Sequence, residues 1–294
     1  MAAPHNNIPN LEVFGKGRGD FKLPCGYVDA EGRVFNHVYL REMSGVEDDI
    51  MGDDELHLSD RMTQIIANCV EKLSTTSSVG DGPKMIEDRD LIMAAVGDDL
   101  KGKGLAFTIA DRMACLLYIR RLSLGDNYSV DGRLCPGCTK PLHNKRIDLS
   151  TLEIGFCKDA TKRNVRVTMP KSKKVATLTV LAAAGERRVA EARPDAKIAR
   201  SFAILGRLIS IDDYAVTGED DAADLAIVQA LPRVDRIHLI NVINIMEGSI
   251  ETEVEVKCNR PGCSTEFKFD LDLGQVFFSN PEEEELSVET LDWV

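Results

Sequence analysis

Two pairs of closely spaced cysteines have the clearest chemical potential in this sequence. Each pair encloses a Pro-Gly step in a short loop, with two residues between the members of the first pair and four between those of the second. A tight turn of this kind directs two sulfurs to one place, and four thiolates form the tetrahedral ligand set of a structural zinc site. The sequence therefore predicts one structural Zn2+ per chain, with the ligands Cys135, Cys138, Cys258 and Cys263.

Two other interpretations of these cysteines stay open at this point. The thiols could lie free in two ordinary turns, or Cys135 and Cys138 could form a redox pair. A redox pair of this spacing needs a helix that starts at the motif, whereas Pro141 and a strand pattern follow the first pair. Four protein ligands would also fill the zinc shell, whereas a catalytic zinc keeps one position open, so the predicted role is structural.

Each cysteine pair is expected at the tip of a β-hairpin, which gives a split zinc ribbon. Loosely alternating residues follow the first pair, and clear alternation of apolar and polar residues flanks the second pair over 250–256 and 267–271. The stretch 139–257 between the pairs is long enough to hold a complete insert. A metal bound by both pairs would join distant parts of the chain and contribute directly to folding.

The remaining patterns predict an α+β fold. Alternating apolar residues flank a Gly-containing turn over 21–40, and a second hairpin is expected over 165–181. Apolar residues at helical spacing form a helical unit after the first hairpin and recur within the insert. Helices are expected over 62–73, 86–96, 108–122, 195–209, 220–231 and 232–248.

These patterns divide the chain into consecutive segments. An N-terminal domain precedes the first half of the ribbon, and an insert separates the two halves. In chain order the expected segments are a mobile arm (1–20), an N-terminal hairpin and helical domain (21–130), the first ribbon half (131–157), an α+β insert (158–247), the second ribbon half (248–279) and an acidic tail (280–294).

Composition and charge exclude several classes of protein. The 294 residues include 36 basic and 48 acidic side chains, and the net charge of −12 argues against a general binder of nucleic acids or membrane surfaces. No apolar run approaches the roughly 18 residues of a membrane helix, and the first residues lack the pattern of a secretory signal. We therefore expect a cytoplasmic protein without a membrane partner.

A basic run over 158–174 supports one alternative function, a zinc-ribbon protein that binds nucleic acid. The run contains seven Lys or Arg residues and a single acid, Asp159. It contains no aromatic residue on which bases could stack, and most runs of this kind are solvated surfaces. Nucleic acid is therefore the less favoured partner.

No combination of side chains predicts an active site, so we expect a protein that is not an enzyme. The segment Gly97–Gly104 approaches a phosphate-binding loop, but Gly104 stands where that motif needs Ser or Thr. The five histidines are scattered and form no ligand motif. The acidic residues are too numerous to single out a general acid and base.

The acidic tail offers candidate partner-binding residues. An acidic run, Glu282–Glu285, precedes apolar residues that include the only Trp of the chain. Buried Trp side chains are frequent anchors of binding hot spots. The alternative is a terminus that folds back onto its own domain. The candidates are Leu286, Leu291 and Trp293.

Several short motifs occur in order along the chain. They are Leu23–Asp29, Leu40–Ile50, Asp111–Arg112 and Tyr118–Asp126, followed by the two cysteine pairs. Together these motifs resemble the T4-family baseplate hub assembly chaperones of contractile-tailed phages and related contractile injection systems. The resemblance extends over about 21–274, whereas the Gly-rich arm, the wider second cysteine loop and the acidic end depart from the family pattern.

The resemblance implies a non-enzymatic protein that assists assembly of the central baseplate hub in the host cytoplasm. The implied partners are the hub or other tail proteins, and the family supplies no catalytic residues. Such a protein either leaves after assembly or is retained in the assembled particle.

Overall fold

The computed structural model describes residues 18–76, 82–97, 104–142, 144–183, 185, 199–217 and 221–278. It has a mixed α+β fold with antiparallel sheets, as the sequence predicted. The acidic tail with Leu286, Leu291 and Trp293 lies outside these residues, as do residues 1–17 of the expected arm. Within the described ranges, no helix combines the length and apolarity required to cross a membrane.

The predicted N-terminal hairpin lies at the centre of a five-stranded antiparallel sheet. Its strands are β1 (Arg18–Asp29) and β2 (Val34–Arg41), so the last residues of the expected arm belong to the sheet. The sheet is completed by β3 (Val70–Ser74), β4 (Met85–Ile86) and β5 (Gly104–Leu105), in the order β4-β3-β2-β1-β5. The accompanying helices are α1 (Gly45–Met51), α2 (Leu58–Cys69), α3 (Arg89–Gly97) and α4 (Ile109–Leu124).

The helix predicted over 62–73 ends earlier than expected. α2 stops at Cys69, and Val70 adopts an extended backbone that begins β3. β3 pairs with β2, and Val70 and Leu73 are completely buried there. Their spacing of three residues is that of one helix face, but only an extended strand can pair with the edge of β2. The expected helical unit therefore also contributes strands to the sheet of the N-terminal hairpin.

The fully buried Arg112 holds the helices of this part together. Its guanidinium group donates to the carbonyl of Val96 in α3 at 2.7 Å. It also donates to the Thr63 hydroxyl at 3.0 Å and to the Ser59 carbonyl at 3.3 Å, both in α2. The buried guanidinium of Arg112 thus fixes α4 against α2 and α3, and its hydrogen bonds offset the cost of burying the charge.

Glu47 connects α1 to β2 from a completely buried position. Arg41 donates to both carboxylate oxygens, at 2.9 and 2.8 Å, and the Ser44 N–H and hydroxyl donate at 2.8 Å each. Burial by itself raises the pKa of Glu47, but the hydrogen bonds from Arg41 and Ser44 outweigh it and lower the pKa to about 2.

The insert forms a second α+β unit with its own core. Its strands β9 (Asn164–Thr168), β10 (Val175–Thr179), β11 (Leu208–Ile211) and β12 (Tyr214–Ala215) make a four-stranded antiparallel sheet in the order β12-β11-β10-β9. Its helices are α6 (Ala199–Leu205), α7 (Asp221–Ala230) and α8 (Arg233–Glu247). The helix predicted to reach residue 209 ends at Leu205, because Leu208–Ile211 extends the sheet beside β10. α8 begins at Arg233, one residue later than predicted, and Pro232 is its N-cap residue.

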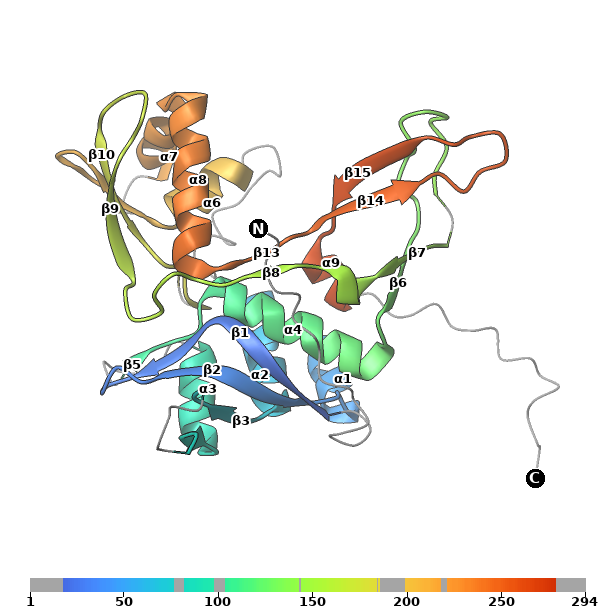
Figure 1. Ribbon diagram of the computed structural model, residues 1–294, viewed down its shortest axis with the longest axis horizontal. Helices are drawn as coiled ribbons and strands as arrows, with labels where there is room; N and C mark the ends of the chain where they lie inside the picture. The colour runs from blue at the N-terminus through green and yellow to red at the C-terminus, as the bar shows by residue number, and fades with distance from the viewer. Residues whose placement is uncertain are drawn as a thin grey trace.

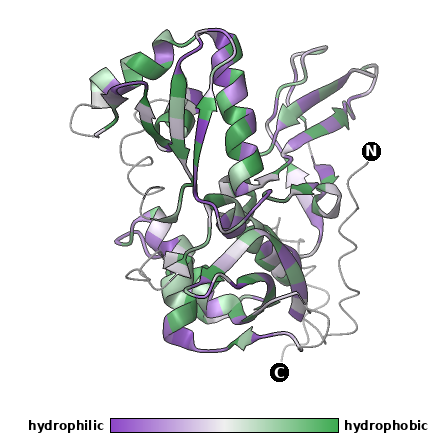
Figure 2. Cartoon of the chain, turned by 60° about the vertical axis from the view of Figure 1, so that its left-hand side comes forward, coloured by the Kyte–Doolittle hydropathy of each residue, from purple (hydrophilic) through white to green (hydrophobic). Residues whose placement is uncertain are grey.

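The chain enters and leaves the insert at neighbouring points. β8 (Ile154–Gly155) pairs with β13 (Ser249–Ile250) in an antiparallel ladder. The insert therefore forms a lobe that is joined to the rest of the molecule at its base, beside the N-terminal end of α4 (Figures 1 and 2).

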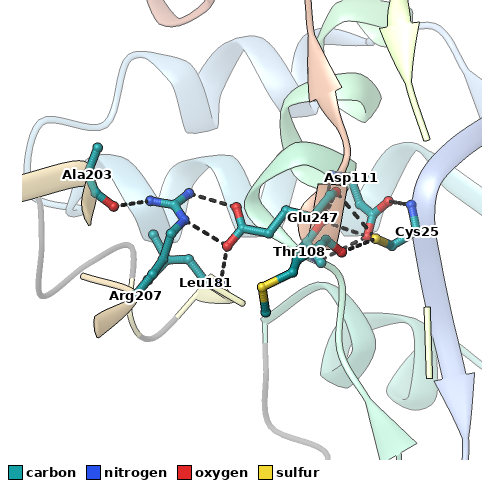
Figure 3. A network of polar contacts seen from close by, with 8 residues as sticks. Cys25, Thr108, Asp111, Leu181, Ala203, Arg207 and Glu247 are labelled. Carbon is teal, nitrogen blue, oxygen red and sulfur yellow. Dashed lines mark hydrogen bonds and ion pairs between the residues drawn. The ribbon is translucent and has the colours of Figure 1, made fainter. Parts of the chain in front are cut away.

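The last residue of α8, Glu247, fixes the base of this lobe (Figure 3). Its buried carboxylate accepts two hydrogen bonds from Arg207, both at 2.7 Å, and one from the Leu181 N–H at 2.6 Å. Its backbone carbonyl accepts from the Thr108 hydroxyl and the Cys25 thiol, both at 3.3 Å. One residue thus contacts the insert, β1 and the start of α4.

Asp111 completes this junction from the first turn of α4. Its carboxylate is fully buried and accepts from the backbone N–H groups of Cys25 at 2.7 Å, Gly26 at 2.9 Å and Thr108 at 2.9 Å. The regular pairing of β1 with β2 shifts between Lys22 and Tyr27, which frees these strand N–H groups for Asp111. The same carboxylate therefore caps α4 and holds the irregular part of β1.

We expect Arg207→Met to lower the free energy of unfolding by about 3–5 kcal/mol, because the variant leaves the Glu247 carboxylate buried without its charged partner. The measurement is denaturant unfolding of both proteins. Lys268→Met is the matched control, since it removes the exposed ion pair with Glu253 and is expected to leave the free energy of unfolding almost unchanged. Equal losses in the two variants would contradict a structural role for the Arg207–Glu247 pair.

The lowered pKa of Glu47 predicts that the stability of the protein depends on pH. Its folded pKa of about 2 lies below its ordinary value of 4.5, so its contribution is complete above pH 4.5 and is lost as the pH falls towards 2. Wild type is expected to be more stable than Glu47→Gln at pH 7, with the difference shrinking below pH 4.5. Denaturant unfolding across this range checks the prediction, and a difference that is independent of pH would refute it.

Candidate metal centre

The first cysteine pair lies in the loop of a β-hairpin. Its strands are β6 (Asn127–Val130) and β7 (Lys145–Asp148), and a bridge between Leu134 and Pro141 continues their pairing towards the loop. The Cys135 N–H donates to the Lys140 carbonyl at 3.0 Å. These contacts close the loop that holds Cys135 and Cys138.

The second pair lies in the loop between β14 (Glu253–Lys257) and β15 (Glu266–Asp270), which also pair antiparallel. The Cys258 N–H donates to the Thr265 carbonyl at 2.9 Å and extends this pairing beyond the strands. The Cys263 N–H donates to the Arg260 carbonyl at 3.1 Å, and Gly262 supplies the positive φ of 80° that the turn requires. The wider second loop is thus as well ordered by hydrogen bonds as the first.

The structure brings all four predicted cysteines together. Their sulfur atoms lie within 4.8 Å of one another, with Cys135 3.8 Å from Cys263 and Cys138 3.9 Å from Cys258. These separations exceed the roughly 2.05 Å of a disulfide bond, and all four thiols are free. The cluster could bind a metal ion, as the sequence predicted.

Two of the four cysteines, one in each loop, are shifted towards the thiolate form, which is the form that binds metals. N–H groups of the first loop, with that of Cys138 contributing most, lower the pKa of Cys135. The hydroxyl and N–H groups of Thr265 lower the pKa of Cys263 to about 6. The N–H of Arg260 lowers the pKa of Cys258, but burial and the neighbouring cysteine thiols outweigh it and raise this pKa to about 11. Each hairpin therefore contributes one sulfur that loses its proton more readily than an ordinary thiol.

Contacts between the two loops keep the sulfurs close together. Arg260 of the second loop donates two hydrogen bonds to the Pro141 carbonyl of the first hairpin, at 3.1 and 2.9 Å. A Cβ atom at Gly137 would lie 2.0 Å from the Thr265 hydroxyl, so glycine allows the loops to approach. These contacts depend on residues from distant parts of the sequence, and no local pattern signalled the pairing of Gly137 with Thr265.

The sulfur cluster belongs to a hydrophobic core. Cys135 and Cys258 are buried, and Cys138 and Cys263 are half-buried. Apolar side chains from both hairpins surround them; the buried members are Tyr128, Val130, Leu142, Ile147, Val254, Val256, Phe269 and Leu271. A bound metal would therefore be part of the packing between the hairpins.

The remaining cysteines lie apart from this cluster. Cys69 and Cys115 are buried in the N-terminal core, and burial raises the pKa of each, for Cys69 to about 12. A hydrogen bond with the Cys157 thiol raises the pKa of Cys25 and lowers that of Cys157. Among the described residues, no other cluster of three or more metal-ligating side chains accompanies these thiols.

Removal of the metal ligands should destabilise the protein. We expect wild type, purified without chelator, to contain about one metal ion per chain, and Cys135→Ser/Cys258→Ser to contain none and to melt at least about 10 °C lower. Metal analysis and a melting curve measure this. Cys157→Ser, at a half-buried thiol outside the cluster, should keep both properties. A metal-free wild type that melts like the double variant would exclude the metal site.

Comparison with known proteins assigns no function to this chain. The chain matches no family model, no curated protein and no solved structure. The assignment therefore depends on the geometry of the cysteine cluster and on the motifs of this sequence.

Proposed function

We propose that the cysteine cluster binds one structural Zn2+ and that the two hairpins form a split zinc ribbon. Four sulfurs at about 2.3 Å from a central zinc lie about 3.8 Å apart along the edges of a tetrahedron. The separations of 3.8 and 3.9 Å between cysteines of opposite hairpins agree with this value. Four thiolates leave no open position for a substrate, so the role of the ion is structural.

The proposed function is that of a non-enzymatic assembly factor or component of a contractile tail baseplate, which acts on the central hub through protein–protein contacts. The observation that carries it is the convergence of the motifs that resemble the baseplate hub chaperones. Cys25 and Gly26 from the first motif bind the carboxylate of Asp111 from the third. The Met43 N–H of the second donates to the Ser123 hydroxyl of the fourth at 2.9 Å. Motifs that a family shares for its scaffold are expected to pack against one another in this way.

The shape of the molecule also supports a role in binding. The β14–β15 hairpin and the insert project from a common base to either side of the molecule (Figure 1). The base is held by Asp111 and Glu247. The β6–β7 hairpin supports the β14–β15 hairpin through contacts between the two cysteine loops. Two braced projections on one base can contact a partner at separated points.

The test is purification of the tagged full chain together with the baseplate hub protein of the same phage or injection system. We expect the hub protein to co-purify with wild type, and much less with Cys135→Ser/Cys258→Ser, because loss of the metal releases the hairpins. A tagged unrelated tail protein serves as the control for non-specific capture. Failure to capture hub or other tail proteins would refute the assignment.

The same preparation tests the alternative of nucleic-acid binding. Two cations of the basic run already contact the protein itself: Arg163 donates to the Gly26 carbonyl at 3.3 Å, and Lys162 lies 3.5 Å from Asp159. We therefore expect weak binding of DNA and RNA. Tight binding whose affinity falls steeply with salt would favour the nucleic-acid function over the assembly function.

A further inference from the structure

A groove separates the two hairpins of the cysteine cluster. Its volume is about 390 Å³, within the roughly 300–1,000 Å³ of ligand-binding sites. All of β7 and most of β14 line it, whereas no residue of β6 or β15 does. Figure 1 shows the two hairpins next to each other. The groove therefore lies between the outer edge of one hairpin and the outer edge of the other.

The ladder of the second hairpin identifies the free backbone groups of β14. The Leu271 N–H donates to the Thr252 carbonyl, and the Cys258 N–H donates to the Thr265 carbonyl. Residues alternate in an antiparallel ladder, so even-numbered residues of β14 bond to β15 and odd-numbered residues direct their N–H and C=O groups away from it. At one end of this edge the Glu253 N–H already donates to the Glu251 carboxylate at 3.3 Å, and Glu255 lies in the middle of the edge.

The same argument applies to β7. The Leu149 N–H donates to the Asp126 carbonyl, so Ile147 and Lys145 bond to β6 and Arg146 points its backbone groups outward. Over the described part of the chain, β7 pairs only with β6 and β14 only with β15. Two free strand edges thus line one groove, and free edges are templates for an added strand.

The side chains of the groove favour a basic occupant. Its acidic members outnumber its basic members; they are Asp148, Glu153, Glu251, Glu253 and Glu255, against Lys145 and Arg146. Glu253 is already paired with Lys268, at 2.9 Å. On the inner face of both strands, Ile147, Val254 and Val256 are buried in the shared core.

We propose that an extended segment of a partner protein, in which Lys or Arg alternates with apolar residues, inserts between β7 and β14 as an added strand. Its backbone pairs with Arg146 on one side and Glu255 on the other. Its apolar side chains meet the inner face and its basic side chains meet the carboxylates. This assignment rests on the proposed assembly function, for which it specifies the chemistry of the bound segment. The chain's own acidic tail has the wrong charge for the groove.

The probe is a peptide of about seven residues in which lysine alternates with valine, added to the metal-loaded full chain. Fluorescence anisotropy is expected to detect binding, and N-methylation of alternate backbone amides should weaken it about tenfold or more, because hydrogen bonds to the strand edges are lost. Equal affinity of the methylated peptide, or no binding of either, would overturn the added strand.

Charge reversal locates the site. Glu253→Lys/Glu255→Lys should weaken the lysine peptide and strengthen a matched peptide with glutamate in place of lysine. Asp270→Lys is the matched control, because Asp270 is exposed on β15 and does not line the groove. Metal content and a melting curve show that each variant is folded. Equal effects of the two variants would place the peptide elsewhere.

Three further outcomes test this inference, and the last two separate it from the assembly function. Peptide binding only after removal of residues 1–17 would identify the chain's own N-terminal segment as the occupant and overturn a partner segment. Capture of the hub protein that is unaffected by Glu253→Lys/Glu255→Lys would retain the assembly function and refute the groove. Peptide binding in the groove without capture of tail proteins would retain the groove and refute the baseplate assignment.

Discussion

The arrangement of this molecule depends on the hydrogen bonds that the buried carboxylate of Asp111 accepts. This carboxylate accepts hydrogen bonds from N–H groups of β1 that the irregular pairing with β2 leaves free, and it caps α4. Glu247 reaches the same place from the end of the insert. Without the Asp111 carboxylate and the Glu247 backbone carbonyl, the N-terminal sheet, α4 and the insert would share a junction lined by unsatisfied polar groups, which proteins avoid.

Short sequence patterns predicted the elements whose conformation depends mainly on residues near them in the sequence. The N-terminal hairpin, α4 and the start of α8 agree with their turn, periodicity and Pro signals. The early end of α2 could not be predicted, because Val70 responds to the free edge of a strand far away in sequence. The cysteines were predictable as two turns with ligand spacing, whereas the contact of Gly137 with Thr265 exists only after both loops have folded.

The cysteine cluster and the groove are two results of one arrangement. The hairpins meet at their tips through sulfur atoms and through Arg260, and at their bases through the pairing of β8 with β13. Between these fixed ends, β7 and β14 share a core but exchange no hydrogen bonds with each other. A frame held at both ends can keep two strand edges apart without collapsing, and such edges would otherwise tend to close or aggregate.

The distance along the chain between the cysteine pairs has a consequence during synthesis. Cys138 precedes Cys258 by 120 positions, which corresponds to roughly 6–24 s of translation at about 5–20 residues per second. During that time Cys135 and Cys138 have been synthesised but Cys258 and Cys263 have not. The first pair is therefore exposed to cellular reductants and metal ions with only two of the four ligands present. The insert therefore has this interval in which to fold before the second pair is made.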